Sequence, residues 1–238
     1  MSNSRDQEIK IQREYYTQTA QEYDSVHVNE SDEHFFALSF MLSTLDNLNI
    51  KSILDVGSGT GRTIKYIKEH RPDIKILGIE PVAELRDVAY SHGIGEKELI
   101  FGDATNLSFQ DNEFDLVCEF GVLHHIKEPQ QAVSEMLRVA KKSIFISDTN
   151  HFAHGSEFIR GAKYFLKSLK LWKFAHLIKT KGKGYTISEG DGLSYPYSVF
   201  DNYLQIEEQC QNIHLLGTKK SRINLYRTAS HVALLGIK

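Results

Sequence analysis

A glycine-rich turn in the first half of the chain is the stretch whose residue types and spacing most directly suggest chemistry. Residues 53–61 read Ile-Leu-Asp-Val-Gly-Ser-Gly-Thr-Gly, an apolar run followed by glycine at alternate positions. Glycine adopts backbone angles that a Cβ forbids, and it lets a ligand approach the main chain closely. A helix expected over 62–70 places unpaired N–H groups beside the turn. The pattern therefore predicts a nucleotide-type ligand between a strand end and a helix.

The spacing narrows the kind of nucleotide site. A dinucleotide fingerprint needs glycine at position 62, where Arg62 stands, and no Gly-Lys-Ser/Thr sequence of a P-loop is present. Acidic residues instead follow the next two apolar runs, as Glu80 and Asp103. A carboxylate about 20 residues beyond such a turn can accept hydrogen bonds from both hydroxyls of a ribose.

Strands and helices alternate from 51 to 150 at the spacing of βαβ units, which predicts a parallel sheet with helices on both faces. The predicted strands are 52–56, 75–80, 98–101, 114–119, 143–148, 213–218 and 231–237, the last two forming an antiparallel hairpin. The predicted helices of this part and of the later chain are 62–70, 82–92, 130–139 and 199–211. Ligands of such sheets bind beyond the carboxyl ends of the strands. The acids at or near those ends are the best site candidates: Asp55, Glu80, Asp103, Glu119 and Asp148.

The flanking segments differ in character from the alternating part. We expect one domain made of an N-terminal helical cap (1–50), a core (51–150 and 212–238) and an insertion (151–211). At 238 residues and 41% hydrophobic content, the chain is long and apolar enough to bury a core.

Charge and cysteine usage limit the function classes. The net charge of −3 argues against a general nucleic-acid-binding surface. Cys118 and Cys210 lie far apart and in no metal-ligand spacing, so a disulfide framework is not expected. The N-terminus lacks an apolar signal core, and no run reaches 18 apolar residues. We therefore expect a soluble protein of the cytoplasm.

The segment 156–183 is strongly basic. It holds eight Lys or Arg residues and one acid, a local charge of +7 that leaves −10 for the remaining chain. On a helix Lys163, Lys167 and Lys170 share one face, while aromatic residues share another. Two interpretations stay open. The lysines form a solvated face, or they attract an anionic acceptor or an anionic membrane surface.

Five consecutive segments together resemble the class I S-adenosylmethionine-dependent methyltransferases, in particular their broad small-molecule subgroup (type 11-like). The matching segments are 54–61, 78–81, 103–109, 114–117 and 122–125. The resemblance implies a Rossmann-like α/β fold with a seven-stranded, mostly parallel sheet, helices on both faces, an antiparallel C-terminal strand and a helical substrate lid. It also implies S-adenosylmethionine as the cofactor and S-adenosylhomocysteine as its product.

The resemblance also implies which residues contact the cofactor. In this family the N-terminal segment folds over the cofactor, and a tyrosine there often meets its methionine end; Tyr15, Tyr16 or Tyr23 could do so, or could pack on the core. We expect Glu80 to hold the ribose and Asp103 to accept from the adenine amine. The full set of expected cofactor residues is Tyr15, Tyr23, Asp55, Gly57, Ser58, Gly59, Gly61, Glu80, Pro81, Asp103, Ala104, Thr105, Glu119 and Phe120.

Methyl transfer from a sulfonium is an in-line displacement on carbon, in which positioning does most of the work. A hydroxyl acceptor must also lose its proton, and histidine is suited to take it. Sugar O-methyltransferases of the resembled subgroup pair a histidine after the fourth strand with an aspartate at the end of the fifth. That implies His124 or His125 with Asp148, although anchoring of a loop is an open alternative. His151 and His154 are second candidates, and no metal-ligand set is evident.

These features favour an enzyme that methylates a small molecule or a saccharide on oxygen, and the basic 156–183 segment leaves open an anionic acceptor. One alternative is a tRNA methyltransferase, since the basic segment could follow phosphates. Another is a lipid or quinone methyltransferase whose 156–183 segment lies on a membrane. No obligate protein partner is evident.

Overall fold

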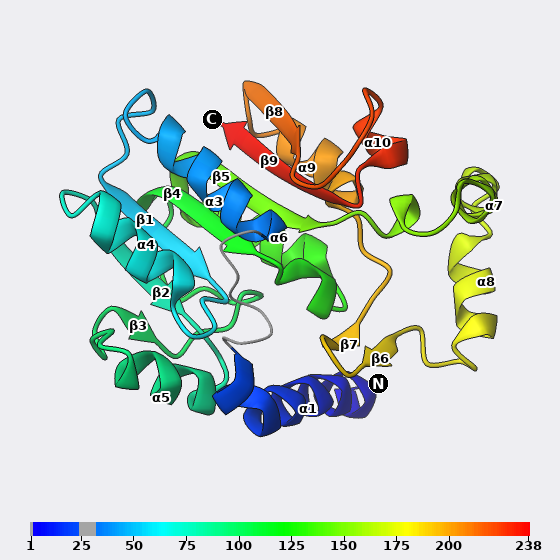
Figure 1. The fold of residues 1–238 in the computed structure, drawn as a ribbon, viewed down its shortest axis with the longest axis horizontal. Helices are drawn as coiled ribbons and strands as arrows, with labels where there is room; N and C mark the ends of the chain where they lie inside the picture. The colour runs from blue at the N-terminus through cyan, green and yellow to red at the C-terminus, as the bar shows by residue number, and fades with distance from the viewer. Residues whose placement is uncertain (1, 24–31) are drawn as a thin grey trace.

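The computed structural model describes residues 2–23 and 32–238. Its centre is a seven-stranded sheet in the order β3-β2-β1-β4-β5-β9-β8 (Figure 1). β9 pairs antiparallel with both β5 and β8, and all other neighbours are parallel. The strands are β1 (Ser52–Val56), β2 (Lys75–Ile79), β3 (Leu99–Ile100), β4 (Phe114–Phe120), β5 (Ala140–Thr149), β8 (Asn212–Gly217) and β9 (His231–Ile237). The predicted Rossmann-like fold is confirmed.

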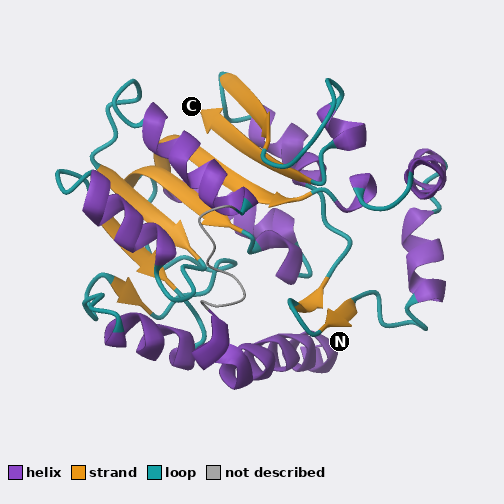
Figure 2. Cartoon of the chain, in the orientation of Figure 1, coloured by secondary structure: helices purple, strands orange, loops and turns teal. Residues whose placement is uncertain are grey.

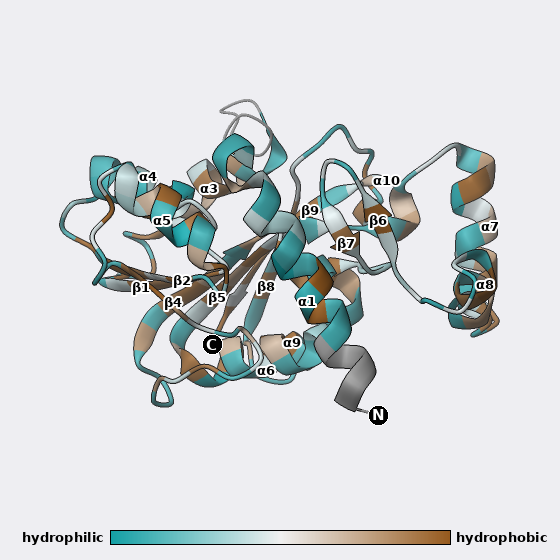
Figure 3. Ribbon diagram, turned by 90° about the horizontal axis from the view of Figure 1, so that it is seen from below, coloured by the Kyte–Doolittle hydropathy of each residue, from teal (hydrophilic) through white to brown (hydrophobic). Residues whose placement is uncertain are grey.

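Helices cover both faces of the sheet, as continuous apolar strands require. All seven residues of β4 are buried. One face carries three helices and the other carries two (Figure 3). The first set is α3 (Glu33–Thr44), α4 (Arg62–His70) and α5 (Ala83–Ser91), and the second is α6 (Pro129–Val139) and α9 (Tyr203–Glu207).

The N-terminal helix α1 (Ser2–Thr19) runs across the carboxyl ends of the central strands (Figure 1). A short 3₁₀ turn, η1 (Ala20–Glu22), follows it. Ala20 packs with Val82, Leu85 and Val88 at the start of α5, and Tyr16 and Tyr23 flank that cluster. The apolar cluster therefore fixes α1 above the sheet edge where a ligand of this fold binds.

The segment between β5 and β8 leaves the sheet and returns to it. It contains η3 (His151–Ala153), α7 (Glu157–Ser168), α8 (Trp172–Lys179), a hairpin of β6 (Thr186–Ser188) and β7 (Gly192–Ser194), and η4 (Val199–Asn202). The hairpin lies against α1, whereas α7 and α8 stand to one side of the sheet (Figure 2).

Element boundaries differ from the predicted ones where tertiary contacts decide them. β3 has two residues, because only Gly78 and Ile79 of β2 pair with it. The predicted helix 199–211 begins as a 3₁₀ turn, since Ser198 and Asp201 form a capping box there. Between β8 and β9 a further short helix occurs, α10 (Leu225–Thr228). Within the described residues, no helix has the length and apolar character needed to cross a bilayer.

Candidate active site

The glycine turn joins β1 to α4 in a conformation that only glycine fits. Gly57, Gly59 and Gly61 have φ angles of +74°, +55° and +86°, in the region that side chains with a Cβ avoid. A Cβ on Gly57 would lie 2.5 Å from Cγ2 of Val122. The N–H groups of Gly57 and Ser58 both donate to the Ile79 carbonyl at 2.9 Å. The turn is therefore fixed to the end of β2.

Glu80 binds the same turn from the next strand. Its Oε2 accepts the Gly59 N–H at 3.1 Å and its Oε1 accepts the Val82 N–H at 2.9 Å. Burial raises the pKa of Glu80 to about 7. Each carboxylate oxygen has a second lone pair, so the predicted contact with a ribose stays compatible with this arrangement. The sequence pattern did not indicate that Glu80 also holds the glycine turn.

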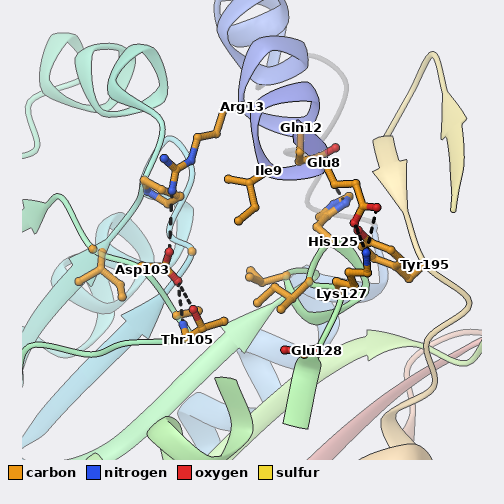
Figure 4. Close-up of a pocket in the computed structure, with 17 residues that line it drawn as sticks. Glu8, Ile9, Gln12, Arg13, Asp103, Thr105, His125, Lys127, Glu128 and Tyr195 are labelled. Atoms are coloured by element: carbon orange, nitrogen blue, oxygen red, sulfur yellow. Dashed lines mark hydrogen bonds and ion pairs between the residues drawn. The ribbon is translucent and has the colours of Figure 1, made fainter. Parts of the chain in front are cut away.

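A cavity of about 780 Å³ of empty space lies beyond these strand ends, under α1 (Figure 4). Gly57, Pro81 and Ala104 line it on the sheet side, and Ile9 of α1 points into it from above. Of the predicted cofactor residues, this cavity therefore brings together Gly57, Pro81, Asp103, Ala104 and Thr105.

Asp103 and Thr105 also lie at this cavity. Oδ1 of Asp103 accepts the N–H of Thr105 at 2.8 Å and its hydroxyl at 2.7 Å. Oδ2 lies 3.8 Å from a guanidinium nitrogen of Arg13 (Figure 4). One carboxylate oxygen thus stabilises the local turn, and only the other is left for the predicted contact with adenine.

Two buried carboxyl groups beside the glycine turn carry oxygens without a hydrogen-bond partner in the described parts of the chain. These atoms are Oδ2 of Asp55 and Oε1 of Glu119. Burial raises the pKa of Asp55 to about 6, and that of Glu119 well above its usual value. Asp55 lines a narrower cavity that shares Gly57 with the first, together with Ser58, Tyr23 and Phe120.

The three candidate tyrosines have separate positions. Tyr23 lies over the glycine turn, where a Cβ on Gly59 would be 3.0 Å from its hydroxyl. Tyr16 stacks edge-on against Tyr23 and reaches His125. Tyr15 instead donates to the backbone carbonyl of Glu189 in the insertion. Of the three tyrosines, only Tyr23 lies beside the glycine turn. The contacts of Tyr15 therefore do not support its expected role in binding the cofactor.

His124 and Asp148 are brought together as predicted, although their roles stay a prediction. His124 belongs to η2 (Leu123–His125), which follows β4, and Asp148 is near the end of β5. Nδ1 of His124 lies 2.7 Å from Oδ1 of Asp148, and Nε2 lies 3.3 Å from Oδ2 of Asp191. Burial lowers the pKa of His124, but the two carboxylates outweigh it and raise that pKa well above its usual value. The two carboxylates therefore favour the protonated form of His124 in the free protein.

The surroundings of His125 lower its pKa, in contrast to those of His124. Its Nδ1 lies 2.7 Å from the Leu193 carbonyl and its Nε2 lies 2.9 Å from the Tyr16 hydroxyl. A carbonyl only accepts, so this contact favours a proton on Nδ1, with Nε2 accepting from Tyr16. The side-chain nitrogen of Gln12 also lies 3.0 Å from Nδ1. Burial, and then the charge of His124, lower the pKa of His125 to about 4. This neutral histidine joins α1 to the β6–β7 hairpin.

Asp191 is a site residue that sequence analysis missed. It stands between two glycines in the turn of the β6–β7 hairpin, a context that reads only as a loop. Ligand atoms of His124, His125 and Asp191 all lie within 4.8 Å of one another. Among residues 2–23 and 32–238 this is the group whose donor atoms could hold a metal ion, although the sequence spacing indicated none.

A second cavity, of about 1,320 Å³ of empty space, opens on the other side of the histidine pair. Its wall is rich in histidine and includes His34, His151, His154 and His231. His124 lines this cavity and His125 lines the first one, with their ring centroids 3.9 Å apart. The two histidines, together with Tyr195, which lines both cavities, therefore lie where the two cavities adjoin.

The comparisons with known proteins agree with this geometry. Residues 54–146, which include the glycine turn, Glu80, Asp103 and both histidines, match the family model described as a methyltransferase domain. These residues therefore match a methyltransferase domain, and solved structures with the same fold include S-adenosylmethionine-dependent methyltransferases. Two features fit a polar cofactor of this kind. The glycine turn has no room for a Cβ, and one buried oxygen of Asp55 has no hydrogen-bond partner in the described parts of the chain.

Two relatives illustrate the breadth of this methyltransferase family. Norajmaline N-methyltransferase of Rauvolfia serpentina is 33% identical over 94 residues, which are 38% of this chain and 32% of that protein. Phosphatidylethanolamine N-methyltransferase of Cereibacter sphaeroides is 36% identical over 117 residues, 42% of this chain and 51% of that protein. The chain thus spans between a third and a half of these relatives. Methylation of oxygen is not among the activities in their names.

The fold extends over most of the chain. A methyltransferase structure from Thermotoga maritima, described as a possible histamine N-methyltransferase, has a TM-score of 0.56 and 18% identity. That match covers 94% of this chain and 99% of the other. At this identity the likeness concerns the fold of the methyltransferase and not its acceptor.

Proposed function

We propose that the protein transfers the methyl group of S-adenosylmethionine to a hydroxyl group of a small molecule or a saccharide. The observation that carries the proposal is the 2.7 Å contact of His124 with Asp148 where two cavities adjoin. A donor in the first cavity and an acceptor in the second would meet beside His124.

The donor half of the proposal uses the first cavity and the narrower cavity that shares Gly57 with it. Gly57 and Gly59 let the cofactor approach the main chain, Glu80 accepts from its ribose, and Asp55 offers an unpartnered oxygen. S-adenosylmethionine supplies an activated methyl group there. In this proposal the segment 1–50 acts as a cap over the cofactor, and the segment 151–211 acts as a lid over the acceptor.

In the acceptor half of the proposal, His124 is the base that takes the proton of the acceptor hydroxyl. In the free protein Asp191 lies against Nε2 of His124. A bound acceptor hydroxyl takes that position, and Nε2, once deprotonated, accepts the hydroxyl proton as the methyl bond forms. Asp148 orients the ring and stabilises the imidazolium that results. The base is therefore ready only after the proton bound in the free protein has left.

The wall of the second cavity suits an acceptor with several hydroxyl groups. Burial is the main cause that lowers the pKa of His34 and His151 to about 3 and of His231 to about 4. At neutral pH these rings are uncharged, and a neutral ring can donate one hydrogen bond and accept another. His34 and His231 already use part of this capacity in contacts with Ser147, Ser230 and Glu33. Sugar hydroxyls need that combination, which favours a saccharide.

Transfer of a radiolabelled methyl group from the cofactor to separated cell fractions tests the proposal. We expect label in the saccharide or other small-molecule fraction, formed by the wild-type protein and lost with Asp148→Asn. Label confined to tRNA, or to a phospholipid headgroup nitrogen, would overturn the acceptor assignment while leaving the cofactor assignment standing.

A further inference from the structure

The pair of helices α7 and α8 exposes its apolar side to solvent. Phe158, Phe165 and Leu169 recur seven and four residues apart and form one stripe, with exposed fractions of 86%, 64% and 50%. Phe174 and Ile178 of α8 are each 64% exposed. Both helices show apolar bands in Figure 3. Isolated exposed apolar residues are ordinary, but several on one pair of neighbouring helices indicate an interaction surface.

The lysines of α7 face the protein instead. Nζ of Lys163 donates to the carbonyls of His151 at 2.8 Å and His154 at 3.1 Å. Nζ of Lys167 lies 2.8 Å from a carboxylate oxygen of Asp201 and 4.0 Å from the ring centre of Phe152. A helix that serves only the fold turns its apolar stripe inward. The orientation of α7 is reversed, because its charges attach it to the body.

This orientation corrects one sequence-based expectation. Lys163 and Lys167 do not form a solvated face with Lys170, because both are bonded to the body of the protein. The basic character of the exposed surface comes from five other lysines. Each of them is exposed and has no carboxylate within 4 Å among residues 2–23 and 32–238, and they are Lys170, Lys173, Lys179, Lys181 and Lys183.

We propose that α7 and α8, with the turn that follows them, dock on the surface of an anionic lipid bilayer. The apolar stripe enters the boundary between headgroups and acyl chains, while the five lysines reach the headgroup phosphates. Each lysine near such a surface is attracted by its negative potential. A bilayer of this composition matches both halves of the exposed surface.

Two other possible partners would match only one part of this surface, either its apolar side chains or its lysines. A second copy of the chain would cover the apolar stripe but would bring two sets of five unpaired lysines together. A nucleic acid would neutralise the lysines but would leave the aromatic side chains in water. Charge complementarity and exposed apolar area together therefore favour the anionic bilayer.

Docking by this surface also orients the second cavity. The chain passes from His151 in the cavity wall directly into α7, and Lys163 ties α7 to the backbone of that wall. The cavity is then held close to the bilayer, where a lipid-anchored acceptor can present its hydroxyl groups. This consequence rests on the proposed function, whereas docking itself does not.

Co-sedimentation of the full chain with vesicles tests the proposal. Vesicles of phosphatidylcholine alone are compared with vesicles that also contain phosphatidylglycerol. We expect the wild-type protein to bind the anionic vesicles at least tenfold more strongly, with binding that weakens as salt is raised. The variant Phe158→Ser/Phe165→Ser/Phe174→Ser should lose at least tenfold of that affinity.

A matched control removes apolar residues that are similarly exposed but lie outside α7 and α8. Leu204 is 71% exposed and Ile223 is fully exposed, and Leu204→Ser/Ile223→Ser should bind vesicles as the wild type does. Calorimetric binding of S-adenosylmethionine to each variant verifies the fold. Equal binding by wild type and triple variant would overturn the proposal. A second outcome would also overturn it: the wild-type protein forms a dimer that the triple variant does not form, and it does not bind anionic vesicles.

Discussion

Nδ1 of His124 and Oδ1 of Asp148 lie 2.7 Å apart although the residues are 24 positions apart in the chain. Parallel pairing of β4 with β5 causes this contact, because it sets Phe120 opposite Ser147 and brings the ends of both strands to one edge. The side chains that follow the two strands then meet. The sheet itself thus builds the pair on which the proposed proton transfer depends.

Asp148→Asn removes the negative charge that stabilises a protonated His124 and keeps the shape of the side chain. We expect the rate of methyl transfer to fall by about 100-fold or more, because positioned acid–base groups contribute about 10²–10⁴ to such rates. Affinity for S-adenosylmethionine should stay unchanged. The rate of S-adenosylhomocysteine formation measures the effect, with Asp87→Asn on an exposed face of α5 as the control. A wild-type rate would assign Asp148 to loop anchoring.

The pH dependence of kcat/KM tests which group loses a proton. Asp148 and Asp191 hold the pKa of His124 well above its usual value, so activity should rise with pH as His124 is deprotonated. Asp191→Asn removes one of the two carboxylates that raise this pKa. The rise in activity should then occur at lower pH than in the wild type. A midpoint that stays in place or moves upward would contradict the assignment of His124 as the base.

Removal of metal ions separates a protonated histidine pair from a metal centre. A metal ligand must be a neutral imidazole, whereas the carboxylates around His124 raise its pKa and favour its protonated form. Dialysis against a chelator should therefore leave methyl transfer at its original rate. Loss of activity that zinc restores would show that His124, His125 and Asp191 hold a metal ion.

Gly57→Ala tests the glycine turn. Its left-handed backbone costs roughly 1–2 kcal/mol with an L side chain, and the new Cβ would also overlap Val122. Gly93→Ala is a matched control, because Gly93 has a φ of +87° and open space around its Cβ position. We expect Gly93→Ala to lower the melting temperature by a few degrees and to keep cofactor binding. Gly57→Ala should lower it further and abolish binding; equal effects would mean that close packing at Gly57 is unimportant.

The part of the site that lies at strand ends could be predicted from sequence, because local patterns determine it. The apolar runs locate the strands, the alternation fixes them as parallel, and residues such as Glu80 and Asp148 then have to reach one edge. Gly57 could be predicted for the same reason, since a strand followed at once by a helix needs a turn with positive φ.

Contacts between distant segments could not be predicted in this way. Asp191 reaches His124 because distant segments hold the β6–β7 hairpin in place, among them Tyr15 and Gln12 of α1. The stripe on α7 was recognised as amphipathic, but periodicity does not tell which face meets the protein. That depends on Asp201 and Phe152, which lie outside the helix and bind Lys167.

Identifying the atom to which the transferred methyl group is bonded tests the central claim most directly. The wild-type protein is incubated with a cofactor whose methyl carbon is isotopically labelled, and the purified product is examined by NMR. We predict a labelled carbon bonded to oxygen, with S-adenosylhomocysteine formed in equal amount. A labelled carbon bonded to nitrogen, sulfur or carbon would contradict methylation of a hydroxyl group and the role assigned to His124 and Asp148.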